Sequence, residues 1–169
     1  MSGRPGLTVE AQYAARRPWV PARAALERWA GAARRAVLRG RRRKREDAVV
    51  HLCVRVVGHA ASRRLNRTYR GKDKATNVLS FPASRDERRF GGSLGDLVIC
   101  APVVAAEARG QGKALPAHWA HMVVHGVLHL HGYDHEHPRA GRAMERLEVE
   151  ILRGFGYQNP YLPVTDPGP

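Results

Sequence analysis

The sequence predicts a single domain of the α/β (α+β) class, with a small mixed β-sheet of three to four strands flanked by about five helices. The chain has 169 residues, of which 43% are hydrophobic, and this is enough to form one core without disulfide bonds. Short segments rich in β-branched residues alternate with longer segments whose apolar residues recur at helical spacing. No internal repeat or interdomain linker interrupts this alternation.

The predicted strands are rich in β-branched and other apolar residues. Residues 48–57 form the longest such segment and are predicted to be a central strand. Residues 76–81, which end before Pro82, and residues 94–100 are predicted to form two further strands. The alternating segment 7–12 is compatible with a short edge strand.

Apolar residues at three- and four-residue spacing predict the helices, and a proline or glycine near their ends supports the boundaries. The charged segment 84–90 is predicted to be a loop. The predicted helices comprise residues 21–38, 62–69, 101–109, 116–130 and 139–155.

We expect residues 1–157 to form the domain and residues 158–169, with their four prolines, to form an extended or disordered tail. The two cysteines, Cys53 and Cys100, lie in predicted strands and are expected to be buried and unpaired. The N-terminus has no secretory signal pattern, and no segment approaches the roughly 18 apolar residues of a membrane span. These features predict a cytoplasmic protein that is not embedded in a membrane.

The formal net charge of +14 predicts a polyanionic partner, with nucleic acid as the leading candidate. Lys and Arg bind phosphates regardless of base sequence, and this binding weakens as the salt concentration rises. Two groups of basic residues are dense, and the first is expected to be a generic electrostatic patch rather than a specific contact surface. The first group contains Arg34, Arg35, Arg39 and residues 41–45, and the second contains Arg63, Arg64, Arg67 and Arg70.

The clearest functional motif is the spacing H-x-x-x-H-x-x-G-x-x-H formed by His125, His129, Gly132 and His135. Two histidines four residues apart share a helix face, and Gly132 allows the chain to return and bring His135 to the same point. Three imidazoles with one open position are typical of catalytic zinc, so we expect one Zn²⁺ per chain. Zinc peptidases with this spacing carry a glutamate after the first histidine as general base, where this chain has Gly126.

Other histidines compete for the role of ligand. His121 lies four residues before His125, so that pair alone would be an equally suitable site. We prefer His125 and His129 because they lie at the end of the predicted helix, where the returning chain can reach them. His121 is therefore expected in the core or beside the ligands, and His131 and His137 are expected to face solvent.

Acidic residues near the motif have alternative interpretations. Asp134 is expected either to orient a ligand through its second ring nitrogen or to cap the turn. In the predicted helix 139–155, arginines interleave with Glu145, Glu148 and Glu150. We interpret this pattern as charge balance along an exposed helix, although it also suits attraction of RNA near the site.

Four separated blocks resemble the signature of the YbeY family, and the match runs in order from about residue 48 to residue 161. The blocks are residues 65–82 (LNRTYRGKDKATNVLSFP), 94–100 (LGDLVIC), 118–126 (HWAHMVVHG) and 156–157 (GY). The resemblance implies a small mixed sheet flanked by helices. It also implies a single-strand-specific endoribonuclease active in ribosomal RNA maturation, particularly at the small-subunit 3′ end, and in ribosome quality control.

The resemblance further implies zinc held by His125, His129 and His135, with Arg70 and His125 as catalytic residues. Zinc bound by imidazoles lowers the pKa of its water to roughly 7, and an arginine can stabilise charge on a phosphoryl group. The nucleophile, water or the RNA 2′-hydroxyl, and its general base stay open. Ribosomal RNA and ribosomal particles are the expected partners, and no small-molecule cofactor is expected.

Two other functions fit parts of the sequence. The net charge also suits a non-catalytic RNA-binding ribosome-assembly factor, in which zinc only stabilises the fold. The histidine spacing also suits a zinc peptidase, and Gly126 argues against that function.

Overall fold

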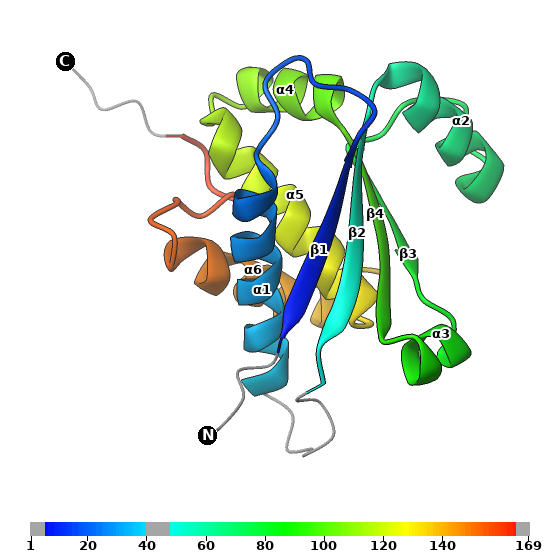
Figure 1. Ribbon diagram of the computed structural model, residues 1–169. Coiled ribbons are helices and arrows are strands. Elements are labelled where there is room, and N and C mark those ends of the chain that lie inside the picture. Colours follow the sequence, from blue (N-terminus) through cyan, green and yellow to red (C-terminus); the bar gives the residue numbers. More distant parts are fainter. Residues whose placement is uncertain (1–5, 40–47, 165–169) are drawn as a thin grey trace.

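The computed structural model describes residues 6–39 and 48–164, and its strands form one mixed sheet with the order β1-β2-β4-β3 (Figure 1). β1 and β4 both pair with β2 in parallel, and β3 pairs with β4 antiparallel. β2 is therefore central, as predicted, whereas β3 is an edge strand. The strands are β1 (Leu7–Tyr13), β2 (Val50–Val57), β3 (Val78–Pro82) and β4 (Ser93–Cys100). The predicted α/β class and small mixed sheet are confirmed.

The described residues also form six helices, of which five match the predicted ones with ends shifted by a few residues. These five are α1 (Arg23–Arg39), α2 (His59–Arg70), α4 (Ala101–Gly110), α5 (Leu115–Leu130) and α6 (Pro138–Arg153). The sixth is α3 (Arg85–Phe90), so the prediction of a loop over residues 84–90 was wrong. The reason is a capping box, in which Ser84 Oγ accepts from the Glu87 N–H and Glu87 Oε2 accepts from the Ser84 N–H. These bonds satisfy helix donors that would otherwise be unpaired.

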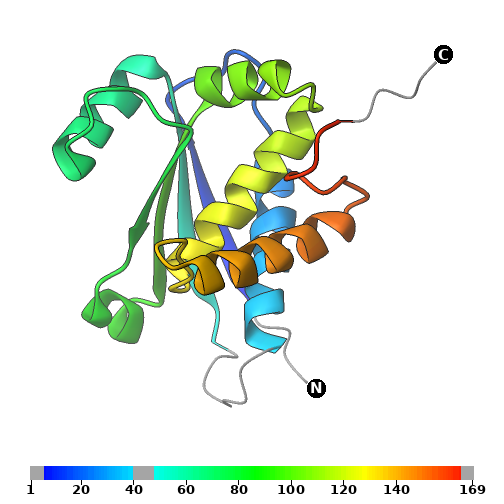
Figure 2. The same ribbon diagram turned by 180° about the vertical axis from the view of Figure 1, so that it is seen from behind.

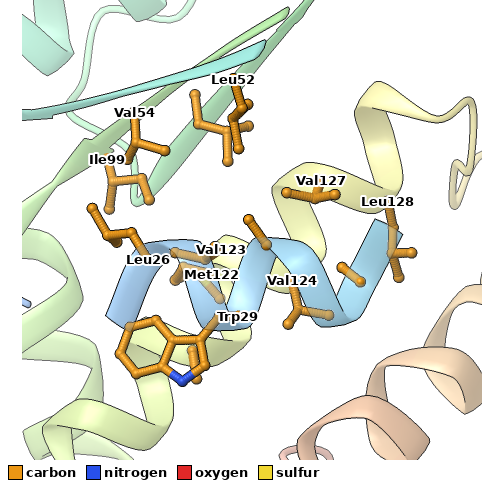
Figure 3. Close-up of a cluster of buried hydrophobic side chains, with 14 of the residues drawn as sticks. Leu26, Trp29, Leu52, Val54, Ile99, Met122, Val123, Val124, Val127 and Leu128 are labelled. Atoms are coloured by element: carbon orange, nitrogen blue, oxygen red, sulfur yellow. The ribbon is translucent and has the colours of Figure 1, made fainter. Parts of the chain in front are cut away.

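The main core lies between one face of the sheet and the helices α1 and α5 (Figure 3). Leu26 and Trp29 of α1 meet Val54 of β2 and Val123 of α5, and all four side chains are at most 3% exposed. Burying an apolar side chain of this size contributes about 1.5–3 kcal/mol. α6 crosses the outer side of α5 (Figure 2), so α5 is enclosed by the sheet, α1 and α6.

The enclosure of α5 explains its sequence. A helix buried on most sides is apolar around its circumference, and eleven of the sixteen residues of α5 are buried. His118 and His121 are among them, and buried imidazoles need hydrogen-bond partners. The core helix therefore also carries the polar groups of the candidate site.

The first basic group is not a uniform surface patch. Arg34 is 5% exposed, and its Nη2 donates to the Ala48 carbonyl oxygen at 3.1 Å, so its assignment to a generic electrostatic patch was wrong. Residues 41–45 of this group lie outside the described residues. In the second group, Arg63 pairs with Asp73 through two hydrogen bonds of 2.8 and 2.9 Å.

Cys100 is buried, as predicted, whereas Cys53 is only partly buried, and both are free cysteines. Among the described residues, no helix has the length and apolar content needed to cross a membrane. Residues 158–164 form neither helix nor strand, and the rest of the predicted tail, residues 165–169, lies outside the described residues.

Gly95 allows β3 and β4 to pair closely beside the end of α5. Its φ angle is +135°, a conformation that residues with side chains rarely adopt. A Cβ atom here would overlap the Phe81 carbonyl oxygen and approach Leu130 Cδ2 to 3.0 Å. Both neighbours are fixed, because one is strand backbone and the other is fully buried.

Gly95→Ala should lower the free energy of unfolding by about 1–3 kcal/mol, because it adds backbone strain and overlap with a paired strand. Urea unfolding measures this change. Gly110→Ala is the matched control, since a Cβ at Gly110, the last residue of α4, has no neighbour within 4 Å. Equal stability of the two variants would contradict the role assigned to Gly95.

Candidate metal centre

The end of α5 brings the three histidines of the motif together. Gly132 has a φ of +93°, and the Tyr133 N–H donates to the Leu128 carbonyl at 3.1 Å, which closes the helix and reverses the chain. His135 then lies against the helix face that carries His125 and His129. The turn at the glycine is confirmed.

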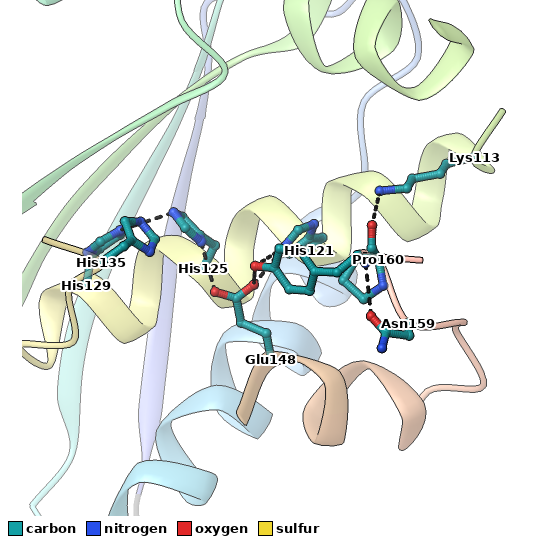
Figure 4. A network of polar contacts seen from close by, with 9 residues as sticks. Lys113, His121, His125, His129, His135, Glu148, Asn159 and Pro160 are labelled. Carbon is teal, nitrogen blue, oxygen red and sulfur yellow. Dashed lines mark hydrogen bonds and ion pairs between the residues drawn. The ribbon is translucent and has the colours of Figure 1, made fainter. Parts of the chain in front are cut away.

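The ring nitrogens of these histidines converge on one point (Figure 4). His129 Nε2 lies 3.1 Å from His125 Nε2 and 2.9 Å from His135 Nε2. The rings of His125 and His135 stack with centroids 4.8 Å apart. All three candidate ligand atoms lie within 4.8 Å of one another, so a single ion could contact all of them.

The hydrogen bonds of the other ring nitrogens fit a metal ion at this point. His125 Nδ1 donates to Glu148 Oε1 at 2.9 Å, and His129 Nδ1 donates to the Tyr133 carbonyl at 2.7 Å. A carbonyl and a carboxylate accept only, so both Nδ1 atoms carry protons, and in its neutral form each ring directs an Nε2 lone pair at the centre. Tetrahedral zinc with Zn–N bonds of about 2.0–2.1 Å needs ligand nitrogens about 3.3 Å apart. The two spacings to His129 Nε2, 3.1 and 2.9 Å, are slightly shorter than this value.

Glu148 of α6 is the residue that sequence reasoning missed. It is 0% exposed, and its two oxygens accept from His125 and from His121 Nε2, the latter at 2.6 Å. The interpretation of Glu148 as charge balance on an exposed helix was therefore wrong. A signal was present in the sequence, because Glu148 lies four residues after Met144 and three before Ile151, within the apolar stripe of α6.

The electrostatics favour an ionised Glu148 and neutral imidazoles. Burial alone would raise the pKa of Glu148, but the hydrogen bonds from His121 and His125 lower it to about 2. Burial lowers the pKa of His121 against the opposing effect of Glu148. Burial and the neighbouring His125 lower the pKa of His129. Neutral imidazole is the form that binds metals.

The remaining polar residues around α5 have defined roles. His121 is buried beside the candidate ligands, as expected, and His118 Nε2 pairs with Glu107 at 2.7 Å. Asp134 Oδ1 accepts from the Glu136 N–H at 3.1 Å, which is the turn-capping alternative. His137 is exposed, whereas His131 is only partly exposed.

Arg70 lies in the same cleft as the three histidines. This cleft has a volume of about 580 Å³, and Arg70, Ser80, His125, His129 and His135 contribute to its lining. Arg70 Nη2 donates to the Ser80 carbonyl of the edge strand β3 at 3.0 Å, and the guanidinium lies 5.4 Å from the centre of the Phe81 ring. Arg70 Nη1 also donates to the Tyr69 carbonyl at 3.4 Å. These contacts hold an exposed cation at the wall of the cleft and leave its remaining N–H groups available.

Gly126 has a packing role. A Cβ at this position would lie 2.7 Å from Leu97 Cδ2, and Leu97 is fully buried in β4. The first turn of the motif therefore packs directly on the sheet, with no space for the glutamate that a zinc peptidase needs after its first histidine.

Residues 21–156 match the family model described as Endoribonuclease YbeY, and this span is most of the chain. The chain therefore belongs to the YbeY family. Two relatives named Endoribonuclease YbeY agree with this assignment. The relative from Stenotrophomonas maltophilia (strain K279a) is 52% identical over 159 residues, which cover 92% of this chain and 93% of the relative. The relative from Aromatoleum aromaticum is 51% identical over 161 residues, with coverages of 95% and 94%.

A solved structure supports the fold of this YbeY family member. The solution structure of a Thermotoga maritima protein superposes with a TM-score of 0.55 at 22% sequence identity. The match covers 92% of this chain and 99% of that protein. At this identity the similarity concerns the fold alone.

The metal-free protein should lose stability in two steps as the pH falls. The folded pKa values of His121 and His129 lie below the ordinary 6.5, so the unfolded chain binds more protons as the pH falls through 6.5. Glu148 adds a second loss between pH 4.5 and about 2 for the same reason. Urea unfolding with a chelator present, repeated across this pH range, measures both steps.

Against the opposing effect of burial, hydrogen bonds from His118 and Asn77 also lower the pKa of Glu107, so Glu148→Gln should reduce the lower step without removing it. A glutamine in place of the exposed His59 should leave both steps unchanged. A free energy of unfolding that stays constant between about pH 7.5 and 3 would contradict the assignment of these groups.

Proposed function

We propose that this chain is a single-strand-specific, metal-dependent endoribonuclease that acts in ribosomal RNA maturation at the small-subunit 3′ end and in ribosome quality control. The observation that carries the proposal is a cleft in which three imidazole Nε2 atoms converge and whose lining includes Arg70. Membership of the YbeY family gives this chemistry its reaction class. Ribosomal RNA and ribosomal particles are the proposed partners, and the proposed location is the cytoplasm.

In this proposal His125, His129 and His135 hold one Zn²⁺. Histidine-bound zinc supplies a Lewis acid that can polarise a phosphoryl oxygen and activate water near neutral pH. Glu148 and the Tyr133 carbonyl keep the protons of His125 and His129 on Nδ1, so that both Nε2 atoms stay available for binding. The catalytic role of His125 is that of a ligand at the reacting centre.

Arg70 is the proposed catalytic cation. The guanidinium is planar and has five N–H donors, and the Ser80 and Tyr69 carbonyls use only part of this capacity. The remaining donors can hold a non-bridging oxygen of the scissile phosphate and stabilise the charge that builds up during cleavage. The net charge of +14 attracts the RNA backbone to this cleft over a longer range.

Variants of the cleft test the proposed reaction. His129→Ala should reduce cleavage of a single-stranded ribosomal RNA fragment to background, and Arg70→Ala should reduce it by about 10²–10³-fold, as for removal of a donor to transition-state charge. His137→Ala and Arg67→Ala are matched controls, because both residues are exposed and neither lines the cleft. All variants require identical purification, since basic proteins carry contaminating nucleases. Wild-type cleavage rates in both cleft variants would refute the proposal.

Metal removal separates catalytic zinc from structural zinc. The main core between the sheet, α1 and α5 does not include the candidate ligands. Chelation should therefore abolish RNA cleavage while the circular dichroism spectrum stays that of a folded protein, and one equivalent of Zn²⁺ should restore cleavage. The alternative of a non-catalytic assembly factor, which the net charge favours, instead predicts unfolding on chelation and salt-sensitive RNA binding without turnover.

A further inference from the structure

The Tyr161 hydroxyl contacts the buried polar group formed by His121 and Glu148, although Tyr161 itself lies outside the helices and strands. It lies in the segment after α6, beyond the residues that match the family model. The residue is 44% exposed, yet its hydroxyl donates to Glu148 Oε2 and lies 3.3 Å from His121 Nε2. The ring therefore remains partly in solvent while its polar end is inserted between α5 and α6.

The segment that carries Tyr161 is held in a defined turn. Lys113, which precedes α5, donates from Nζ to the Pro160 carbonyl at 2.5 Å. The Tyr161 N–H donates to Asn159 Oδ1 at 2.9 Å, and the Leu162 N–H lies 3.3 Å from the Asn159 carbonyl. A side-chain amide that accepts from the N–H two residues later is a common turn-forming arrangement. The hydroxyl is thus presented to Glu148 by a structured loop.

Glu148 connects Tyr161 to the candidate ligand His125, because it accepts hydrogen bonds from both. An ionised carboxylate only accepts, so Tyr161, His121 and His125 all donate to it. Tyr161 and His121 share Oε2, which leaves Oε1 for His125 Nδ1. The two donors at Oε2 therefore fix the rotation of the carboxylate, and Oε1 in turn fixes the imidazole ring whose Nε2 faces the metal point.

We propose that Tyr161 is a positioning residue for the metal centre, acting through Glu148 on the ligand His125. This inference rests on the proposed function, which assigns a metal ion to His125, His129 and His135. Partners of ligating histidines influence metal affinity nearly as much as the ligands do, because they set the proton position and the ring orientation. Tyr161 lies one hydrogen bond further from the metal point than Glu148. The proposal therefore makes metal affinity depend on a residue that follows α6.

The neighbouring Tyr157 provides a matched comparison. Its ring packs against the main core, whereas the ring of Tyr161 makes its ring contact with His121 at a centroid distance of 5.4 Å. Replacing either tyrosine with phenylalanine removes one oxygen and keeps the ring. Only the change at Tyr161 removes a hydrogen bond to the carboxylate.

The experiment measures Zn²⁺ affinity of the full chain by competition with a chromophoric chelator, for wild type, Tyr161→Phe and Tyr157→Phe. Replacing an outer partner of a ligand weakens metal binding roughly 10–100-fold, and Tyr161 acts one bond further away, so we expect a loss of roughly three- to tenfold for Tyr161→Phe. Tyr157→Phe should bind like wild type. The visible absorption bands of the Co²⁺-loaded protein should shift only in Tyr161→Phe, because they report ligand geometry.

A second variant, Lys113→Met, loosens the turn without changing Tyr161, and it should weaken Zn²⁺ binding in the same direction by a smaller factor. Unchanged affinity and an unchanged Co²⁺ spectrum in Tyr161→Phe would overturn the inference, even if its thermal stability falls. An equal loss in Tyr157→Phe would also overturn it. Absence of Zn²⁺ binding by wild type would instead overturn the metal centre itself, which His129→Ala tests separately.

Discussion

A carboxylate without exposed surface stays ionised only when its oxygens are hydrogen-bonded, and Glu148 imposes this requirement on the centre of the protein. Its donors come from two turns of α5 and from the segment after α6. α6 cannot pack on α5 without burying Glu148, and the buried carboxylate then needs hydrogen-bond donors. The packing of α6 on α5 therefore also fixes the proton of His125 on Nδ1 and the position of the Tyr161 hydroxyl. Helix packing and site geometry are therefore set by the same contacts.

The parts of the site that are close in sequence could be predicted from the sequence. His125, His129 and His135 meet because a helix face and one glycine turn determine their relative positions, and both features are local. Glu148 could not be placed in this way, because its partners depend on how α6 crosses α5. Arg70 reaches the cleft through α2 and the edge strand β3, so no spacing rule locates it, and only the resemblance to a family indicated it.

The errors in secondary structure and burial have a different cause, because in both cases a local signal was present in the sequence. The spacing of Ser84 and Glu87 was a local signal for a short helix, but the surrounding charges favoured the prediction of a loop. Arg34 was grouped with its basic neighbours along the chain. It lies four residues after Ala30 and three before Val37, both of which are buried in α1, so helical periodicity already placed it on the inner face.

The compact placement of the three histidines between residues 125 and 135 has a thermodynamic consequence. Imidazoles this close along the chain can also chelate an ion when the protein is unfolded, and a ligand bound by both states stabilises the native state only by the difference in affinity. That difference arises from what only the folded chain supplies, including the fixed geometry of α5 and the hydrogen bonds of His125 to Glu148 and of His129 to the Tyr133 carbonyl. How strongly a metal stabilises this fold therefore depends on the contacts that hold the ligands in place as well as on the ligands.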